Sequence, residues 1–179
     1  MTTLDPALRA RLMAAVRDVP DFPKPGIVFK DITPILADAR LFGETIEALA
    51  APYIGRGITH VAAIESRGFL LGAPVARVLG AGLIPLRKAG KLPWKTQRES
   101  YDLEYGTDAL EVHADALGSA TRVVIVDDVL ATGGTAAAAA RLALRCGARV
   151  EGFSFLMSLD FLGGKQRLDM APVTSLLDY

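Results

Sequence analysis

The sequence predicts an α/β fold in which a mostly parallel central sheet is flanked by helices on both faces. Short apolar runs typical of buried strands alternate with helix-like stretches between residues 60 and 159, the pattern of βαβ units. The length of 179 residues fits a single domain, 1–179, and the 51% hydrophobic content is sufficient for a core. Cys146 is the only cysteine, so disulfide-stapled folds and all-thiolate zinc sites are excluded.

The N-terminal residues predict one helix followed by an irregular segment. Asp5 and Pro6 form a typical N-cap and first-turn pair, and Pro20 marks the far end of this helix. Residues 21–34 are rich in proline and contain Gly26, so we expect an ordered loop there. Residues 1–36 together are expected to form an N-terminal helix and a hood at one side of the sheet.

The remaining elements follow from apolar runs and their boundaries. Strands are expected at residues 60–64, 81–86, 122–128 and 150–159. Helices are expected at residues 38–54, 68–80 and 135–147, and Gly147 occupies the position of a C-terminal cap.

Residues 91–113 predict a flexible flap above the sheet. The second half of the segment 91–117 alternates like an antiparallel hairpin, with Gly106 near its turn. Five basic residues and no acid lie between Arg87 and Arg98. Such a run is usually a solvated face, but beside an anion site a cationic lid is the better interpretation.

The overall charge argues against nucleic acid as a partner. Lys and Arg total 20, Asp and Glu total 20, and the net charge is zero, whereas general nucleic-acid binders carry a basic excess. No uninterrupted apolar run reaches the length of a membrane span, and the N-terminus does not read as a signal peptide. We therefore expect a cytoplasmic protein that acts on small molecules.

The segment VVIVDDVLATGGT, residues 123–135, predicts a site for a phosphorylated sugar. A buried strand ends in Asp127 and Asp128, and a turn of small residues containing Gly133 and Gly134 leads into a helix. Uncovered amides and the positive end of the helix dipole favour a phosphate, whereas the carboxylates suit sugar hydroxyls. Paired aspartates alone could simply cap a helix, but the full string favours the phosphate site. It contains neither a P-loop nor a GxGxxG motif.

This string resembles the 5-phosphoribosyl-1-diphosphate (PRPP) binding motif of the type I phosphoribosyltransferases. Five further segments resemble the adenine-specific members of that family, in the same order: residues 21–36, 65–72, 86–93, 99–106 and 171–179. The resemblance implies Mg²⁺-dependent transfer of 5-phosphoribose from PRPP to N9 of adenine, giving AMP and diphosphate in purine salvage. It also implies a homodimer, and magnesium carried by PRPP without a direct protein ligand.

The resemblance assigns roles to individual residues. The phosphate and ribose of PRPP or AMP would contact Asp127, Asp128, Ala131, Thr132, Gly133, Gly134 and Thr135. The diphosphate would contact Glu65, Ser66, Arg67, Arg87, Lys88 and Lys91. The first three belong to a loop whose peptide is often strained or cis in the family. Adenine would contact Val28, Phe29, Lys30 and Val129. The catalytic residues would be Glu104, which accepts a proton from the base, and Arg67, with Tyr105 beside Glu104 in the flap.

Two other functions stay open at this point. The acceptor could be xanthine, hypoxanthine, guanine or orotate, or the chain could be a non-catalytic PRPP sensor that binds nucleic acid. Enzymes for 6-oxopurines in this superfamily place a lysine on the strand after the phosphate helix, yet residues 150–164 contain no lysine or arginine. The absence of a basic residue there favours adenine, because a donor that faces the 6-amino group would leave buried polar groups without hydrogen-bond partners. Glu104 and the lack of a basic excess argue against the sensor.

Overall fold

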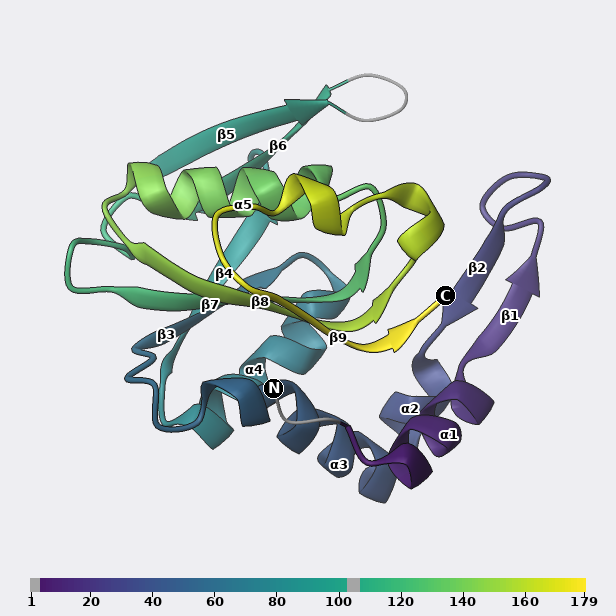
Figure 1. The fold of residues 1–179 in the computed structure, drawn as a ribbon. Coiled ribbons are helices and arrows are strands. Elements are labelled where there is room, and N and C mark those ends of the chain that lie inside the picture. The colour runs from purple at the N-terminus through teal and green to yellow at the C-terminus, as the bar shows by residue number, and fades with distance from the viewer. Residues whose placement is uncertain (1–3, 103–106) are drawn as a thin grey trace.

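The computed structural model describes residues 4–102 and 107–179 and confirms the predicted α/β class. Within these residues one sheet has the strand order β5-β6-β4-β3-β7-β8-β9 (Figure 1). Its parallel strands are β3 (His60–Ile64), β4 (Gly82–Lys88), β7 (Arg122–Leu130), β8 (Arg149–Ser158) and β9 (Val173–Asp178). The flap strands β5 (Thr96–Asp102) and β6 (Thr107–His113) join antiparallel at the β4 edge.

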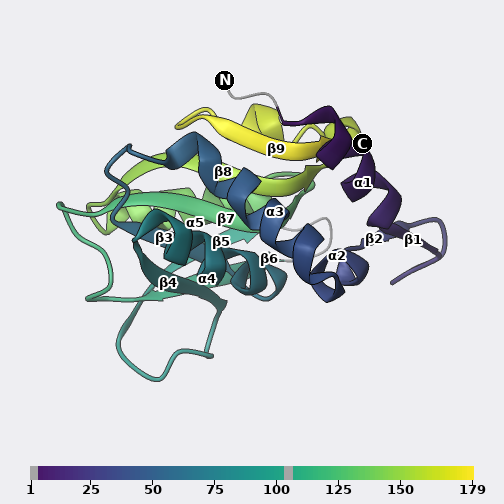
Figure 2. The ribbon, with the colours of Figure 1, turned by 90° about the horizontal axis from the view of Figure 1, so that it is seen from below.

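Helices cover both faces of the parallel strands. α5 (Gly134–Arg145) packs on one face, and α3 (Ala39–Ala50) and α4 (Arg67–Leu79) pack on the other (Figures 1 and 2). Along β7, Val123 and Ile125 belong to the core on the α5 side, whereas Val124 and Val126 belong to the core on the α3 and α4 side. Burial on both faces explains why these strands are continuous apolar runs in the sequence.

The N-terminal region differs from the prediction. α1 (Pro6–Ala15) ends well before Pro20, and β1 (Arg17–Pro20) pairs antiparallel with β2 (Val28–Asp31). Pro20 lies at the end of an edge strand, where its missing N–H costs little, so it does not mark a helix end. The segment expected to be a loop therefore contains a strand, and α2 (Thr33–Ala37) follows it. We call β1, β2 and their connection the hood ribbon (residues 17–31); it projects from the body of the molecule (Figure 1).

Smaller differences concern element ends. The helix expected at residues 38–54 is α3 followed by a 3₁₀ turn, η1 (Ala51–Tyr53), and the Asp38 side chain caps α3 by accepting from the Arg40 and Leu41 amides. Two further 3₁₀ turns, η2 (Asp160–Leu162) and η3 (Lys165–Arg167), precede β9, a strand that the sequence analysis did not predict. Among the described residues no helix is long and apolar enough to cross a membrane.

A glycine sets the distance between α4 and the sheet. A Cβ atom built on Gly72 would lie 2.5 Å from the Cβ of Ala63 in β3, so no larger residue fits there without moving the helix. This contact matters for function because α4 begins at the loop that follows β3.

We expect Gly72→Ala to lower the free energy of unfolding by about 1–3 kcal/mol, because the added methyl group overpacks the helix–sheet contact. Gly43→Ala in α3 is the matched control, since nothing lies within 4 Å of a Cβ atom at Gly43. It should raise the free energy of unfolding by about 0.5–1 kcal/mol. Urea unfolding measures both changes; a Gly72→Ala variant as stable as the parent protein would contradict the packing argument.

Candidate active site

The loops after β3 and β7 leave the sheet side by side. Ala63 pairs with Val126 in the parallel β3–β7 register, so both strands present their carboxyl ends at the same edge. The loop after β3 leads into α4, and the loop after β7 leads into α5. Ligands of open α/β sheets bind at this edge, where the predicted diphosphate and phosphate residues come together.

The phosphate loop, residues 131–135, ends at a helix start with uncovered amides. Gly133 is the N-cap of α5 with a φ of +79°, a conformation that favours glycine, and no described side chain caps the helix. The amides of the first turn have no intrahelical acceptor. Together with the helix dipole they form a site suited to a phosphate monoester.

Gly164 supports the phosphate loop from the opposite side. A Cβ atom on Gly164 would lie 2.1 Å from the carbonyl oxygen of Ala131, and one on Gly133 would lie 2.6 Å from the carbonyl oxygen of Gly164. The two backbones therefore pack directly against each other. Gly164 was not predicted as part of the site; the signal for it in the sequence is the Gly163–Gly164 pair after the last predicted strand.

The two aspartates after β7 lie against the first turn of α4. The Asp128 amide donates to Asp127 Oδ1 at 2.9 Å, and Arg67 Nε lies 2.8 Å from Asp128 Oδ2. A Cβ atom on Gly68 would lie 2.7 Å from Asp127 Oδ1, so α4 closely abuts this carboxylate. Burial, together with the negative charge of Asp128, raises the pKa of Asp127. A ligand that donates hydroxyl hydrogens to this pair would relieve the repulsion between the two charges.

Glu65, predicted to contact the diphosphate, is the shared partner of two basic side chains. Its Oε1 lies 2.5 Å from Lys91 Nζ, its Oε2 lies 3.3 Å from Arg87 Nε, and the Lys88 amide donates to Oε2 at 3.0 Å. Burial alone would raise the pKa of Glu65, but the hydrogen bonds from Lys91, Arg87 and the Lys88 amide outweigh it and lower the pKa to about 2. The peptide bond between Glu65 and Ser66 is cis.

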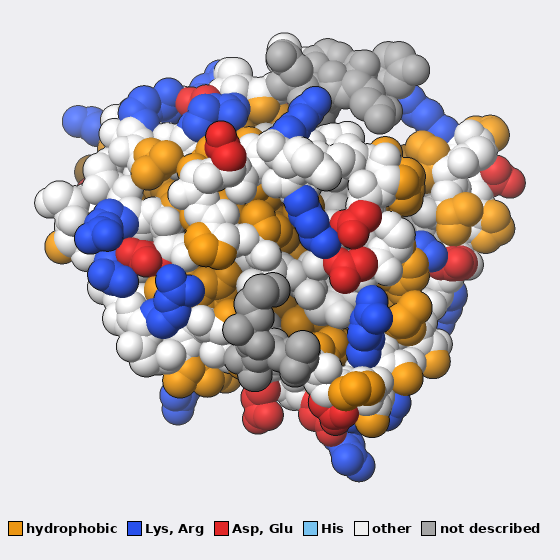
Figure 3. Space-filling view, in the orientation of Figure 1, with side chains coloured by type: hydrophobic (Ala, Val, Ile, Leu, Met, Phe, Trp, Pro, Cys, Tyr) orange, Lys and Arg blue, Asp and Glu red, His pale blue; other side chains and the backbone are white. Residues whose placement is uncertain are grey.

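The Lys88 side chain lies apart from this cluster. Its Nζ forms an ion pair with Asp108 Oδ2 of the flap strand β6 at 3.2 Å, and the hydrogen bond to Asp108 raises the pKa of Lys88. Asp108 was not identified from the sequence, because cross-strand pairing is invisible there. On the face drawn in Figure 3, basic side chains lie next to acidic ones, which agrees with the neutral net charge.

The hood ribbon contributes an aromatic face near the aspartates. The Arg67 guanidinium carbon lies 4.7 Å from the centroid of the Phe29 ring, and Phe22 packs edge-on against Phe29 at 5.1 Å. Arg67 therefore links the hood to Asp128. Of the other residues predicted for the base, Val28 is half-exposed, and Val129 is partly buried directly after Asp128.

The flap strands are attached to α5. Glu99 of β5 accepts from Arg141 Nε and Arg145 Nη1, both at 2.7 Å. The buried Tyr101 of β5 donates to Asp108 Oδ2 of β6 at 3.3 Å, and it lines the same cavity as Gly134 at the start of α5. Glu104 and Tyr105, predicted at the flap tip, lie outside the described residues.

Comparison with known proteins identifies the family. The phosphoribosyl transferase domain family matches residues 33–159. Adenine phosphoribosyltransferase of Myxococcus xanthus (strain DK1622) is 59% identical over 175 residues, which cover 98% of this chain and 95% of that protein. The chain belongs to the adenine phosphoribosyltransferase family.

Solved structures of adenine phosphoribosyltransferases have the same fold. The Rhodothermus marinus enzyme superposes with a TM-score of 0.94 at 50% identity, covering 98% of this chain and 100% of that one. The Saccharomyces cerevisiae enzyme, complexed with an imino-altritol bisphosphate and adenine, superposes with a TM-score of 0.89 at 40% identity, covering 95% and 98%. The predicted type I fold, with its antiparallel flap and its hood, is therefore confirmed.

Phosphoribosyltransferases of this family generally use PRPP with Mg²⁺. Among the described residues, no group of three His, Cys, Asp or Glu side chains could hold a metal ion. Asp127 and Asp128 offer carboxylate oxygens, which suit a hard cation or its water molecules. The pair therefore fits magnesium that is already bound to a phosphorylated sugar.

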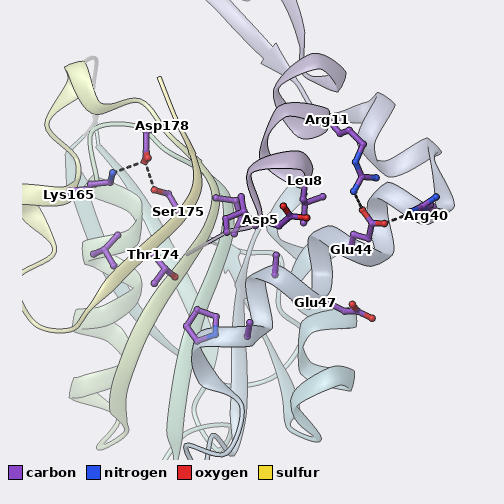
Figure 4. Close-up of a pocket in the computed structure, with 16 residues that line it drawn as sticks. Asp5, Leu8, Arg11, Arg40, Glu44, Glu47, Lys165, Thr174, Ser175 and Asp178 are labelled. Atoms are coloured by element: carbon purple, nitrogen blue, oxygen red, sulfur yellow. Dashed lines mark hydrogen bonds and ion pairs between the residues drawn. The ribbon is translucent and has the colours of Figure 1, made fainter. Parts of the chain in front are cut away.

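Two cavities lie near these elements. One, of about 490 Å³, opens beside the start of α5 and is lined in part by Gly134, Tyr101 and Arg167. The other, of about 770 Å³, lies between α1, α3 and β9, and none of the residues predicted for the family's substrates lines it (Figure 4). The first adjoins the phosphate loop, whereas the second is a separate feature.

We expect Glu65→Gln to destabilise the protein at neutral pH by about 1 kcal/mol, once solvent screening is allowed for. Because the folded pKa of Glu65, about 2, is below the ordinary value of 4.5, its stabilisation is present above pH 4.5. This stabilisation is lost as the pH falls toward 2. The difference in the free energy of unfolding between variant and parent should therefore shrink on acidification. Urea unfolding at pH 7 and pH 3.5 measures this.

Glu47→Gln is the control, because Glu47 is exposed and forms no ion pair within the described part of the chain. Glu47→Gln should change the free energy of unfolding only slightly at both pH values. A Glu65→Gln difference that stays constant between pH 7 and pH 3.5 would contradict the ion-pair cluster.

Proposed function

We propose that this chain transfers the 5-phosphoribosyl group of PRPP to N9 of adenine and releases AMP and diphosphate, as a step of purine salvage. The observation that carries the proposal is that four features meet at one sheet edge. The phosphate loop, the aspartate pair, the cations around Glu65 and the hood aromatic Phe29 all lie at or against the carboxyl ends of β3 and β7. The names of the relatives, and the adenine in the yeast complex, support this substrate.

The phosphate loop would hold the 5-phosphate of PRPP. Its main-chain amides would donate to the phosphate oxygens, and the hydroxyls of Thr132 and Thr135 would add further donors. Asp127 and Asp128 would accept from the ribose hydroxyls. The residues proposed for this subsite are Asp127, Asp128, Ala131, Thr132, Gly133, Gly134 and Thr135.

The diphosphate would replace the acidic partners of the basic residues. In the structure Arg67 is paired with Asp128, and Arg87 and Lys91 are paired with Glu65. A diphosphate group offers these cations more negative charge than one carboxylate, so they would turn to it. Glu65 and Ser66 would contribute the loop backbone, and Lys88 would approach from the flap side. The Mg²⁺ that PRPP carries would neutralise part of the charge on the leaving group.

The reaction exchanges one bond at C1 of the ribose. The C1–O bond to diphosphate breaks and its electron pair leaves with diphosphate, while N9 of adenine forms the new bond to C1. The base loses a proton in this step, and Glu104 of the flap would accept it with Tyr105 beside it. Closure of the flap, residues 91–113, would also exclude water, which would otherwise hydrolyse the activated sugar.

Adenine would lie between the hood and the end of β7. Phe29 would stack on one face of the base and Val129 would contact the other. Backbone groups of Val28 and Lys30 would pair with its edge. Residues 150–164 contain no lysine or arginine, so no cationic donor from this segment would face the 6-amino group.

The proposal extends to the assembly and to the place of action. The chain would act as a single domain, residues 1–179, with the hood in residues 1–36. We propose a homodimer in the cytoplasm, with adenine and PRPP as substrates and neither nucleic acid nor membrane as a partner.

Incubation of the purified protein with PRPP, Mg²⁺ and each base in turn, with release of diphosphate as the readout, tests the proposal. Turnover should be fastest with adenine by at least about 100-fold over hypoxanthine, guanine, xanthine and orotate, because a mismatched 6-substituent leaves buried groups unpaired. A preference for a 6-oxopurine would refute the assignment of the base. PRPP binding without turnover on any base would indicate a sensor instead.

A further inference from the structure

Two cation–π contacts of the described residues connect the hood ribbon to the body; the body supplies the cation in one and the aromatic ring in the other. Arg67 of the body lies over the ring of Phe29, at 4.7 Å. Lys30, the next residue of β2, places its Nζ 4.2 Å from the centroid of the Tyr179 ring, which belongs to the body. Successive side chains of a strand point to opposite faces, so the two contacts hold β2 from both sides.

The Lys30 side chain is fixed on the hood. Its Nζ lies 2.6 Å from Asp18 Oδ1, and Asp18 is the cross-strand partner of Lys30 in the β1–β2 ribbon. Only 18% of the Lys30 side chain is exposed. Because a carboxylate and an aromatic ring both hold the Lys30 cation, its side chain has little freedom to move. The position of β2, the strand that carries Lys30, is therefore fixed as well.

Tyr179 is fixed on the body. Its amide donates to the carbonyl of Ser158, and its carbonyl accepts from the amide of Asp160, both at 2.9 Å. Asp178, the preceding residue, accepts from Lys165 Nζ at 2.8 Å and from Ser175 Oγ at 2.6 Å (Figure 4). The aromatic ring is thus anchored at the carboxyl end of β8, next to the edge that carries the site.

The two contacts differ in what happens when substrates bind. Under the proposed function Arg67 turns to the diphosphate and adenine stacks on Phe29, so the contact between these two residues is lost. The Lys30–Tyr179 contact is formed by the Lys30 side chain and the Tyr179 ring, and neither would touch a substrate. Only the backbone of Lys30 would do so. The Lys30–Tyr179 contact therefore persists while the other contact is exchanged.

We propose that Tyr179 is a positioning residue for the adenine site. Its ring, together with Asp18, holds Lys30 and keeps β2 at a fixed distance from the sheet edge while substrates displace Arg67. This inference rests on the proposed function for its kinetic consequence, but the attachment of the hood can be measured without turnover.

Tyr179→Leu removes the ring and keeps an apolar side chain. We expect it to raise the KM for adenine about 3- to 10-fold, the effect of losing one cation–π contact, with kcat and the KM for PRPP within about twofold of the parent. Tyr179→Phe keeps the ring and should behave like the parent. Lys30→Met loses the same contact together with the Asp18 ion pair, so it should raise the KM for adenine at least as much as Tyr179→Leu. The double variant should be no worse than Lys30→Met, because Tyr179 then has no cation to contact.

Arg56→Met is the matched control. Arg56 lies over the ring of Tyr53 at 5.7 Å, a cation–π contact outside the hood, so its loss should leave the KM for adenine unchanged. A Tyr179→Phe variant as impaired as Tyr179→Leu, or a Tyr179→Leu variant with an unchanged KM for adenine, would overturn the proposal.

Hydrogen–deuterium exchange provides the readout that does not depend on turnover. Tyr179→Leu should speed exchange of the β2 amides and leave those of β3 and β7 unchanged. Equal protection of β2 in variant and parent would overturn the inference even if the enzyme is active. Failure of the parent protein to turn over adenine would instead refute the proposed function, and the exchange result would still decide whether Tyr179 holds the hood.

Discussion

The direct packing of the phosphate loop against Gly164 is the constraint on which the site depends. A loop that offers its amides to a ligand cannot use them to stabilise itself, so its shape has to come from its other side. Gly164 supplies that support, because it lets one backbone approach the other with no side chain between them. In the same way, the close approach of Gly68 to Asp127 supports the loop after β3, which leads into α4. Close packing within the protein thereby holds both loops in place.

The charges of the site are balanced within the protein. Arg67 is paired with Asp128, Arg87 and Lys91 share Glu65, and Lys88 is paired with Asp108. This arrangement lets a chain with zero net charge keep cations ready for a highly charged substrate. The cations of these pairs are partly exposed, and a ligand must offer better partners than the carboxylates to displace them, which favours a diphosphate over a single phosphate.

The sequence predicted the parts of the fold that local pattern determines. β3 and β7 were found because burial on both faces makes them continuous apolar runs, and the phosphate loop because small residues follow paired aspartates. The hood strands were missed, since β1 and β2 are short and lie among prolines and polar residues. Tyr179 and Lys30 lie about 150 positions apart in the chain, and no local pattern reports such a contact. The roles of Glu104 and Tyr105 remain predictions.

The phosphate loop as the holder of the 5-phosphate is the central claim, and a crystal structure of the protein with AMP tests it most directly. The account predicts phosphate oxygens within about 3 Å of the main-chain amides of residues 132–135, with the ribose hydroxyls on Asp127 and Asp128. AMP bound with its phosphate at any other place, such as the cavity between α1, α3 and β9, would contradict it.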